Sequence, residues 1–273
     1  MGEPVSRAPK RLQKRAADAH KGTFGSVLVI AGSEFMLGAA ILCARGALRG
    51  GAGLVRVALP RALCAPLMSA CPCAMTLDRA DRTALRSALA DADAVVVGPG
   101  LGVNASTRRI VADALKFAAC PVVLDADALN VLAPLVGPLP CAQPKVLLPH
   151  PGEAARLLSC TTDEVQRDRE DAAAQLSARS GAISVLKGAA TIVCEGARRY
   201  RNTTGNPGMA TGGSGDVLAG LVAALLAQGM DPFDAACLGV HVHGKAGDRV
   251  SKRLSQAGLI AEDLPLAIAE ELA

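Results

Sequence analysis

The sequence predicts an α/β domain with a doubly wound, mostly parallel β-sheet and helices on both faces of the sheet. Short apolar runs alternate with helical patterns along most of the 273 residues, which is typical of such a sheet. The runs at residues 27–31 and 94–97 are continuously apolar, as expected for strands covered on both sides. Neither a Pro- or Ser-rich linker nor an internal repeat interrupts the pattern, so we expect residues 23–273 to form a single domain.

The predicted elements follow one another along the chain. Strands are expected at 27–31, 54–58, 94–97, 122–124 and 146–148, and helices at 38–48, 105–117 and 152–158. Three adjoining strands with short turns then follow at 183–186, 191–194 and 198–201. The remaining chain has helical patterns over about 215–228, 232–250 and 261–272.

Composition bounds the class of protein. Apolar residues make up 51% of the chain and charged residues 20%, which permits a large core and argues against a disordered chain. Aromatic residues are only 2%, so a ring ligand would rest mainly on aliphatic side chains. Residues 1–22 read as a basic polar arm, in which the cations are Arg7, Lys10, Arg11, Lys14, Arg15 and Lys21. Because the rest of the chain has no basic stripe interleaved with aromatic residues, we expect no nucleic-acid partner.

The cysteines and the apolar runs predict a cytoplasmic location. Nine cysteines are dispersed through apolar segments, and the odd number indicates reduced, buried thiols. The close pair Cys71 and Cys73 lacks the spacing of a zinc or redox motif. The N-terminus has no apolar signal core, and the longest helical apolar run, 218–227, is too short to span a bilayer, so we expect no membrane segment.

A glycine-rich turn precedes the apolar helical run near residue 215, in the segment GNPGMATGGSGDVLAG. Glycines let a ligand approach backbone N–H groups closely, and the start of a helix attracts anions. We therefore expect Gly212, Gly213, Ser214 and Gly215 to form an anion hole for phosphate. Asp216 at its mouth would compete with phosphate unless it acts as a base toward an attacking hydroxyl. The alternative is a flexible loop in which Asp216 stabilises the helix start.

Polar or glycine-rich loops also follow the predicted strands. The loop GPGLG, which ends at Gly102, could bind a ligand or be an ordinary turn, and its third glycine comes one residue too early for the dinucleotide fingerprint. Asp125, Asp127 and Asn130 could hold a metal ion or a ribose, or they could cap the next helix.

His150 and Lys187 follow two further strands. His150 could contact a ligand or have a structural role, and Lys187 could bind phosphate or a nucleotide or be a solvated turn residue. Because the carboxyl ends of parallel strands share one edge, these loops and the glycine-rich turn should converge there.

The segment GVHVHGK at 239–245 resembles a Walker A phosphate loop, but we do not expect one there. Ala246 stands where Ser or Thr is required, and the segment lies in a helical run rather than after a strand. His241 and His243 are two residues apart, so on a helix they would not share a face and would not form a metal pair.

Seven segments occur in a distinctive order from about Lys21 to Leu272: KGTFGSVLVIAGS, GAAILCARGALRGGAGLV, VVVGPGLG, VVLDADALN, LLPHPGEAARLL, VLKGAATIV and NPGMATGGSGDVLAG. In this order they resemble the ADP-dependent NAD(P)H-hydrate dehydratases of the ribokinase-like superfamily. The resemblance implies that NADH or NADPH hydrated at C6 is converted back to NAD(P)H while ADP becomes AMP and phosphate. In this carbon–oxygen lyase reaction Asp216 would take the proton from the C6 hydroxyl as it attacks the β-phosphoryl group, and the anion hole would stabilise the developing charge.

The resemblance also assigns ligand contacts. The hydrated dinucleotide should contact Ala40, Gly102, Asn130, His150 and Asp216. ADP should contact Lys187, Gly188, Ala189, Ala190, Thr191 and Gly215. Magnesium should arrive with ADP and not in a protein metal site, and the family tends toward homotetramers. Many relatives carry an epimerase domain, for which the short basic arm leaves no room, so we expect action on the S epimer only, with a separate epimerase in the same pathway.

Two other functions fit parts of the pattern. A small-molecule kinase of the same superfamily, such as a hydroxyethylthiazole kinase, would share the glycine-rich turn and Asp216 but not the PHPGE segment. A catalytically silent nucleotide-sensing module would have no need of an intact Asp216.

Overall fold

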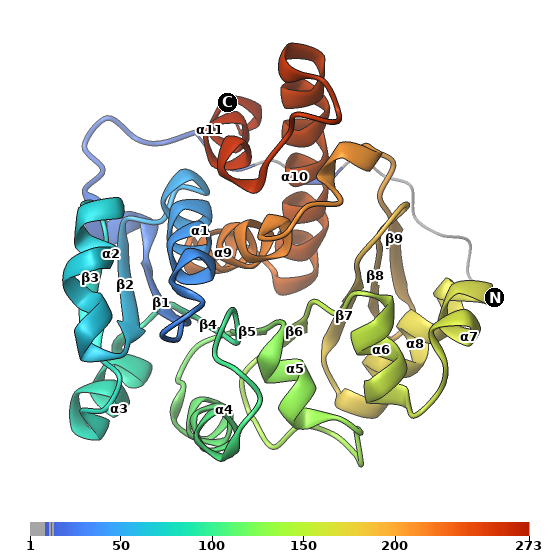
Figure 1. The fold of residues 1–273 in the computed structure, drawn as a ribbon, viewed down its shortest axis with the longest axis horizontal. Coiled ribbons are helices and arrows are strands. Elements are labelled where there is room, and N and C mark those ends of the chain that lie inside the picture. The colour runs from blue at the N-terminus through green and yellow to red at the C-terminus, as the bar shows by residue number, and fades with distance from the viewer. Residues whose placement is uncertain (1–8, 11, 13, 273) are drawn as a thin grey trace.

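A nine-stranded sheet runs through the computed structural model, which describes residues 9, 10, 12 and 14–272 (Figure 1). Its strand order is β3-β2-β1-β4-β5-β6-β7-β8-β9. The strands are β1 (Ser26–Ile30), β2 (Leu54–Leu59), β3 (Met75–Asp78), β4 (Ala94–Val97), β5 (Val122–Leu124), β6 (Lys145–Leu147), β7 (Ile183–Leu186), β8 (Ile192–Glu195) and β9 (Arg198–Arg201). The pairs from β3 to β7 are parallel, whereas β8 and β9 pair antiparallel.

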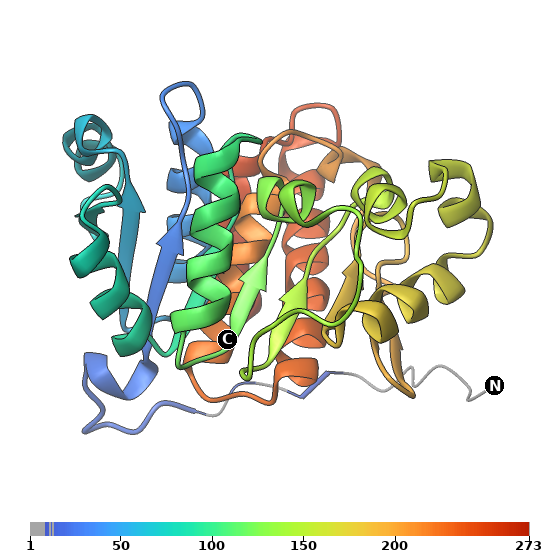
Figure 2. The ribbon, with the colours of Figure 1, turned by 90° about the horizontal axis from the view of Figure 1, so that it is seen from below.

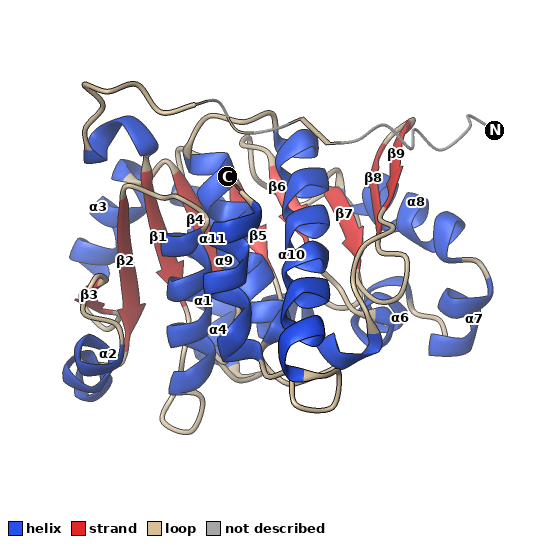
Figure 3. Cartoon of the chain, turned by 90° about the horizontal axis from the view of Figure 1, so that it is seen from above, coloured by secondary structure: helices blue, strands red, loops and turns tan. Residues whose placement is uncertain are grey.

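Helices cover both faces of this sheet, as Figures 2 and 3 show from opposite sides. One face carries α1 (Leu37–Arg49), α9 (Ser214–Ala227), α10 (Pro232–Leu254) and α11 (Leu264–Glu271). The other carries α3 (Arg82–Asp91), α4 (Ala105–Phe117), α5 (Asp127–Leu132), α6 (Pro151–Leu158) and α8 (Arg169–Ser180). The remaining α-helices of the described chain, α2 (Cys64–Ala70) and α7 (Thr162–Arg167), are short, and four 3-10 helices lie at Lys21–Phe24, Arg61–Leu63, Pro207–Met209 and Ala261–Asp263. The predicted doubly wound α/β architecture is therefore confirmed.

The continuously apolar strands contribute side chains to two hydrophobic cores, one on each face of the sheet. In β1, Val27 and Val29 face the core under α1 and α9, and Leu28 and Ile30 face the core under α3 and α4. All four side chains are at most 1% exposed. Since side chains alternate between the faces of a sheet, a strand buried on both faces has no polar positions.

Several elements were not predicted from the sequence. The edge strand β3 has the sequence MTLD and no fully buried residue, so it lacks the apolar run that marks the inner strands. Helices α3, α7 and α8 carry many polar residues, and α2 is short. Their pairing and packing become evident only in the tertiary structure.

Close packing of α9 against α1 depends on two glycines. A Cβ at Gly46 would lie 2.3 Å from the Val217 carbonyl oxygen, and one at Gly220 would lie 2.0 Å from the Cys43 carbonyl oxygen. The two helix backbones are therefore in direct contact, and both helices start at the edge where the parallel strands end (Figure 3).

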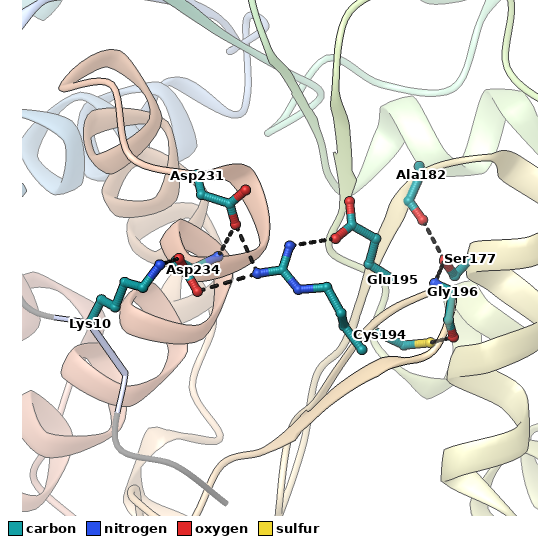
Figure 4. Close-up of polar contacts among 9 residues, drawn as sticks. Lys10, Ser177, Ala182, Cys194, Glu195, Gly196, Asp231 and Asp234 are labelled. Atoms are coloured by element: carbon teal, nitrogen blue, oxygen red, sulfur yellow. Dashed lines mark hydrogen bonds and ion pairs between the residues drawn. The ribbon is translucent and has the colours of Figure 1, made fainter. Parts of the chain in front are cut away.

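The described part of the basic arm contacts the end of the domain where the parallel strands begin. Lys10 pairs with Asp234 at 2.7 Å, and Arg198 bonds both Asp231 and Asp234 from the β8–β9 hairpin (Figure 4). Arg15 donates to the Gly51 carbonyl oxygen at 2.7 Å. The other predicted arm cations Arg7 and Arg11 lie outside the described residues.

All nine cysteines are free thiols, of which Cys43, Cys71, Cys120, Cys194 and Cys237 are buried. Cys73 is exposed, so the expectation that the thiols are buried holds only in part. Along residues 9, 10, 12 and 14–272, no helix has both the length and the apolar character needed to cross a bilayer.

Candidate active site

The predicted loops meet at the carboxyl edge of the parallel strands. The Gly102 amide donates to Asp127 at 2.7 Å, which joins the loop after β4 to the one after β5. Lys187, after β7, reaches Asp125, after β5, at 2.6 Å. A Cβ at Gly215 would lie 3.2 Å from the Lys187 ammonium, so the start of α9 lies against the same cluster. The expected convergence is therefore confirmed.

The glycine-rich turn forms the start of α9. Gly213 precedes the first helical residue with φ 90°, and a Cβ there would lie 2.4 Å from Leu42 Cδ1. A side chain at this position would be excluded by both conformation and space. The first backbone N–H groups of a helix have no acceptor within it, and those of Gly215 and Asp216 have no backbone acceptor among the described residues, so they can bind an anion.

Asp216 lies in the first turn of α9, beside the buried charges. Burial raises the pKa of its carboxyl to about 7, and the neighbouring Asp125 acts in the same direction. Lys187 opposes this shift without cancelling it. A carboxyl with a pKa near 7 suits a general base at neutral pH, because both of its protonation states are accessible there.

Lys187 holds a cluster of carboxylates together. Its side chain contacts Asp125 at 2.6 Å and Glu153 at 3.9 Å, and these carboxylates are 1% and 5% exposed. Burial opposes the charge on Lys187, but Asp125 and Glu153 outweigh it and raise the pKa of the ammonium. Lys187 is therefore a charged residue in the floor of the site, and the interpretation as a solvated turn residue is wrong.

His150 has a structural role at the start of α6. Its Nδ1 accepts from the amides of Gly152 at 3.0 Å and Glu153 at 3.3 Å, and Glu153 accepts from the His150 amide at 2.8 Å. Burial and Lys187 lower the pKa of the imidazole, consistent with a neutral ring that accepts at Nδ1. Half of the side chain remains exposed, so a ligand can still reach the ring.

Asp127 and Asn130 stabilise neighbouring loops. Asp127 accepts from the Gly102 amide, and Asn130 donates to Asp127 at 3.3 Å and accepts from Arg156 at 3.0 Å. Within the described part of the chain, no three His, Cys, Asp or Glu side chains converge in a way that could hold a metal ion. Ala126 between the two aspartates has φ 49°, a strained conformation of the kind found at functional sites.

The loop after β7 turns sharply before β8. Gly188 has φ 124° and Ala190 φ 52°, and the Thr191 hydroxyl donates to the Gly188 carbonyl oxygen at 2.9 Å. Ala189 lies between the two at the exposed turn. The loop is therefore closed by its own hydrogen bond, at the edge of the site.

Ala40 is placed differently from the other predicted contacts. Its side chain is 0% exposed in α1, and a Cβ at Gly32 would lie 3.1 Å from it. In this structure Ala40 is therefore not accessible to a ligand.

A cavity of about 350 Å³ opens beside Gly212. Ile41, Leu42 and Ile260 contribute to its lining, together with the paired Arg45 and Glu262. Among its lining residues, Gly212 is the one that belongs to the predicted site.

His243 contacts the glycine-rich turn, and the sequence analysis did not predict this contact. Its Nε2 lies 3.0 Å from the Ser214 carbonyl oxygen and 3.4 Å from the Ser214 hydroxyl. Burial lowers the pKa of His243 to about 4, so the ring is neutral and can donate to the carbonyl. The segment that contains it is helical, in α10, which confirms that it is no phosphate loop. No local pattern pairs it with Ser214, because the contact arises from helix packing.

Comparisons with known proteins agree with this geometry. Residues 27–269 match the family model described as NAD(P)H-hydrate dehydratase. The chain is 42% identical over 275 residues to the ADP-dependent (S)-NAD(P)H-hydrate dehydratase of Neisseria meningitidis, covering 97% of this chain and 90% of the relative. It is 41% identical over 266 residues to the bifunctional NAD(P)H-hydrate repair enzyme Nnr of Moorella thermoacetica, covering 93% of this chain and 50% of the relative. The chain thus spans about half the length of the bifunctional relatives.

Solved structures have the same fold. The ADP/ATP-dependent NAD(P)H-hydrate dehydratase of Bacillus subtilis, co-crystallized with ATP/Mg2+, superposes with a TM-score of 0.87 at 32% identity, covering 96% of this chain and 93% of that one. A ribokinase-like superfamily protein from Enterococcus faecalis gives a TM-score of 0.86 at 28% identity, covering 95% and 90%. The chain therefore has the ribokinase-like fold and belongs to the NAD(P)H-hydrate dehydratase family.

Proposed function

We propose that the protein catalyses the ADP-dependent dehydration of the S epimer of hydrated NADH and NADPH, giving NAD(P)H, AMP and phosphate. The observation that carries the proposal is the position of Asp216, a carboxyl with a pKa near 7 at the start of α9, beside free helix N–H groups. The name of the Neisseria relative supports the choice of substrate and nucleotide.

Asp216 would act as the base. It takes the proton from the C6 hydroxyl, whose oxygen forms a bond to the β-phosphorus of ADP while the bond to the AMP oxygen breaks. The ring nitrogen's lone pair then expels the phosphate ester from C6, and loss of a proton from C5 restores the double bond. The anion hole of Gly212, Gly213, Ser214 and Gly215 stabilises the charge on the transferred phosphoryl group.

ADP would lie against the nucleotide loop, which comprises Lys187, Gly188, Ala189, Ala190 and Thr191, and against Gly215. Magnesium would come with the phosphates of ADP, whose charge it neutralises when bound. The nearby carboxylates fit this arrangement, because Asp125 is paired with Lys187 and Asp127 with the Gly102 amide, and among the described residues neither belongs to a group of side chains that could hold a metal ion.

The hydrated dinucleotide would lie between the loop at Gly102, the exposed half of His150 and Asp216. It would contact Ala40, which is buried in α1, once the neighbouring residues move. Asn130 supports this wall through Asp127 and Arg156.

We also propose that the enzyme acts in the cytoplasm as a homotetramer and depends on a separate epimerase for the other hydrate epimer. Free thiols at all nine cysteines support a reducing compartment. Relatives about twice as long that are named bifunctional support a second activity in the same repair.

The test is recovery of NADH from its hydrate. The purified protein is incubated with the S epimer of hydrated NADH, ADP and magnesium, and absorbance at the reduced-nicotinamide band is followed. Recovery that requires ADP and is lost in Asp216→Asn supports the proposal, provided that the variant still binds ADP. No recovery with either ADP or ATP would refute it.

A further inference from the structure

A half-buried arginine lies directly under the nucleotide loop. Arg169 is the first residue of α8, and its side chain extends to the carboxyl end of β7. Its Nη2 donates to the Leu186 carbonyl oxygen at 3.1 Å and to the Lys187 carbonyl oxygen at 3.2 Å. One guanidinium group thus binds the last strand residue and the first loop residue.

Gly188 lets the loop rest on this guanidinium. A Cβ at Gly188 would lie 3.4 Å from both Nη1 and Nη2 of Arg169, which is van der Waals contact, and the φ of 124° favours glycine at this position. The carbonyl of Lys187 and the amide of Gly188 belong to one planar trans peptide and point in opposite directions. Because Arg169 holds the carbonyl, the Gly188 N–H points away from the guanidinium.

The charge of Arg169 has no acidic counterpart. In the described ranges of the chain, no carboxylate forms an ion pair with it, and Nη1 bonds the neutral Gln166 side chain at 2.9 Å. Its Nε is buried with no hydrogen-bond partner among the described residues. Burial and the nearby Arg201 lower the pKa of the guanidinium, yet an arginine stays protonated at neutral pH.

An unpaired, partly buried cation carries a desolvation penalty that an anion beside it would offset. Four features therefore coincide at the nucleotide loop: two fixed carbonyls, an amide turned outward, a glycine with positive φ against the guanidinium, and a positive charge that no described carboxylate pairs with.

We propose that Arg169 is a positioning residue for the adenine nucleotide, which fixes the nucleotide loop from below and supplies a positive charge that favours the nucleotide phosphates. The inference rests on the proposed function only in that this loop binds ADP. Arg169 acts through the loop backbone and its electrostatic field.

Calorimetric titration of the full chain with ADP and with adenosine tests this role. Arg169→Met should raise the Kd for ADP about tenfold or more, as expected when a nearby positive charge that favours the phosphates is removed, and change the Kd for adenosine less than about threefold. Arg169→Lys keeps the positive charge but lacks the planar guanidinium that bonds both carbonyls, so it should lose less ADP affinity than Arg169→Met. The exposed Arg167, two residues earlier, provides the matched control, and Arg167→Met should leave both affinities unchanged.

Equal losses for ADP and adenosine in a folded Arg169→Met protein would reduce Arg169 to a purely structural residue and overturn the proposal, as would unchanged ADP affinity. If Arg169→Met does not fold, the ADP affinity and its salt dependence are compared between the wild type and Arg169→Lys. If Arg169→Lys has the same ADP affinity and salt dependence as the wild type, the guanidinium group does not position the loop, and the proposal is overturned. ADP binding that depends on Arg169 in a protein without dehydratase activity would refute the proposed function and leave this inference standing.

Discussion

Replacing Asp216 with asparagine should stabilise the protein at alkaline pH while abolishing turnover. The folded protein raises the pKa of this carboxyl from its ordinary 3.8 to about 7, chiefly by burial. Between these values the folded state holds a proton that the unfolded chain has already released, so the free energy of unfolding of the wild type falls as pH rises. Asparagine resembles the protonated form at every pH and avoids this loss.

The magnitude follows from the shift. A difference of about 3 pKa units corresponds to at most about 4 kcal/mol, at about 1.36 kcal/mol per unit. Asp216 keeps partial contact with solvent and shares its field with Asp125 and Lys187, so we expect about 1–3 kcal/mol at pH 8. The advantage of Asp216→Asn should be nearly absent at pH 4 and complete above about pH 7.

Urea unfolding at a series of pH values measures this difference. Asp18→Asn, at an exposed position of the arm, is the control and should track the wild type across the series. If Asp216→Asn is no more stable than the wild type at pH 8, or if its advantage is the same at pH 4, the carboxyl does not have a raised pKa. The same ionisation should appear in catalysis as a limb of kcat/KM that rises with pH through about 7.

Three further outcomes follow from the packing of the site. Lys187→Met should destabilise the protein by about 3–5 kcal/mol because it leaves buried carboxylates unpaired, and the double variant with Asp125→Asn should recover much of this loss in urea unfolding. A single variant within about 1 kcal/mol of wild type would contradict a buried ion pair there. His243→Ala should lower kcat and reduce the free energy of unfolding by about 1–3 kcal/mol, because the Ser214 carbonyl loses its hydrogen-bond donor. Unchanged kinetics would show that His243 does not support the anion hole. Gly220→Ala should reduce the free energy of unfolding by about 3 kcal/mol or prevent folding, since its Cβ would lie 2.0 Å from a carbonyl oxygen of α1. A variant with the thermal stability of the wild type would exclude this close helix contact.

Three of the polar loop residues have two possible roles in the sequence, and their hydrogen-bond partners establish the structural one. His150 is a helix cap whose ring remains half exposed, and Asp127 and Asn130 join loops together. A lone histidine or aspartate has the same local pattern in each role, so sequence reasoning left them undecided. Their hydrogen-bond partners lie on the same or adjacent loops, but the geometry depends on how those loops pack.

The sequence by itself determined the fold class and the place of the site. Continuous apolar strands alternating with helical patterns require a sheet buried on both faces, and glycine and polar residues at strand ends mark the loops of its carboxyl edge. These signals are local and periodic, so they can be identified without knowing what packs against them. The glycine-rich turn before Asp216 belongs to this class, because its backbone conformation is encoded by its own residues.

Only the tertiary structure decided the electrostatics of the site. Lys187 meets Asp125 across 62 residues of sequence and His243 meets Ser214 across 29. Such pairs depend on strand order and helix packing, which no local pattern specifies. The same is true of the pKa of Asp216, since burial and neighbouring charges arise only when distant segments come together.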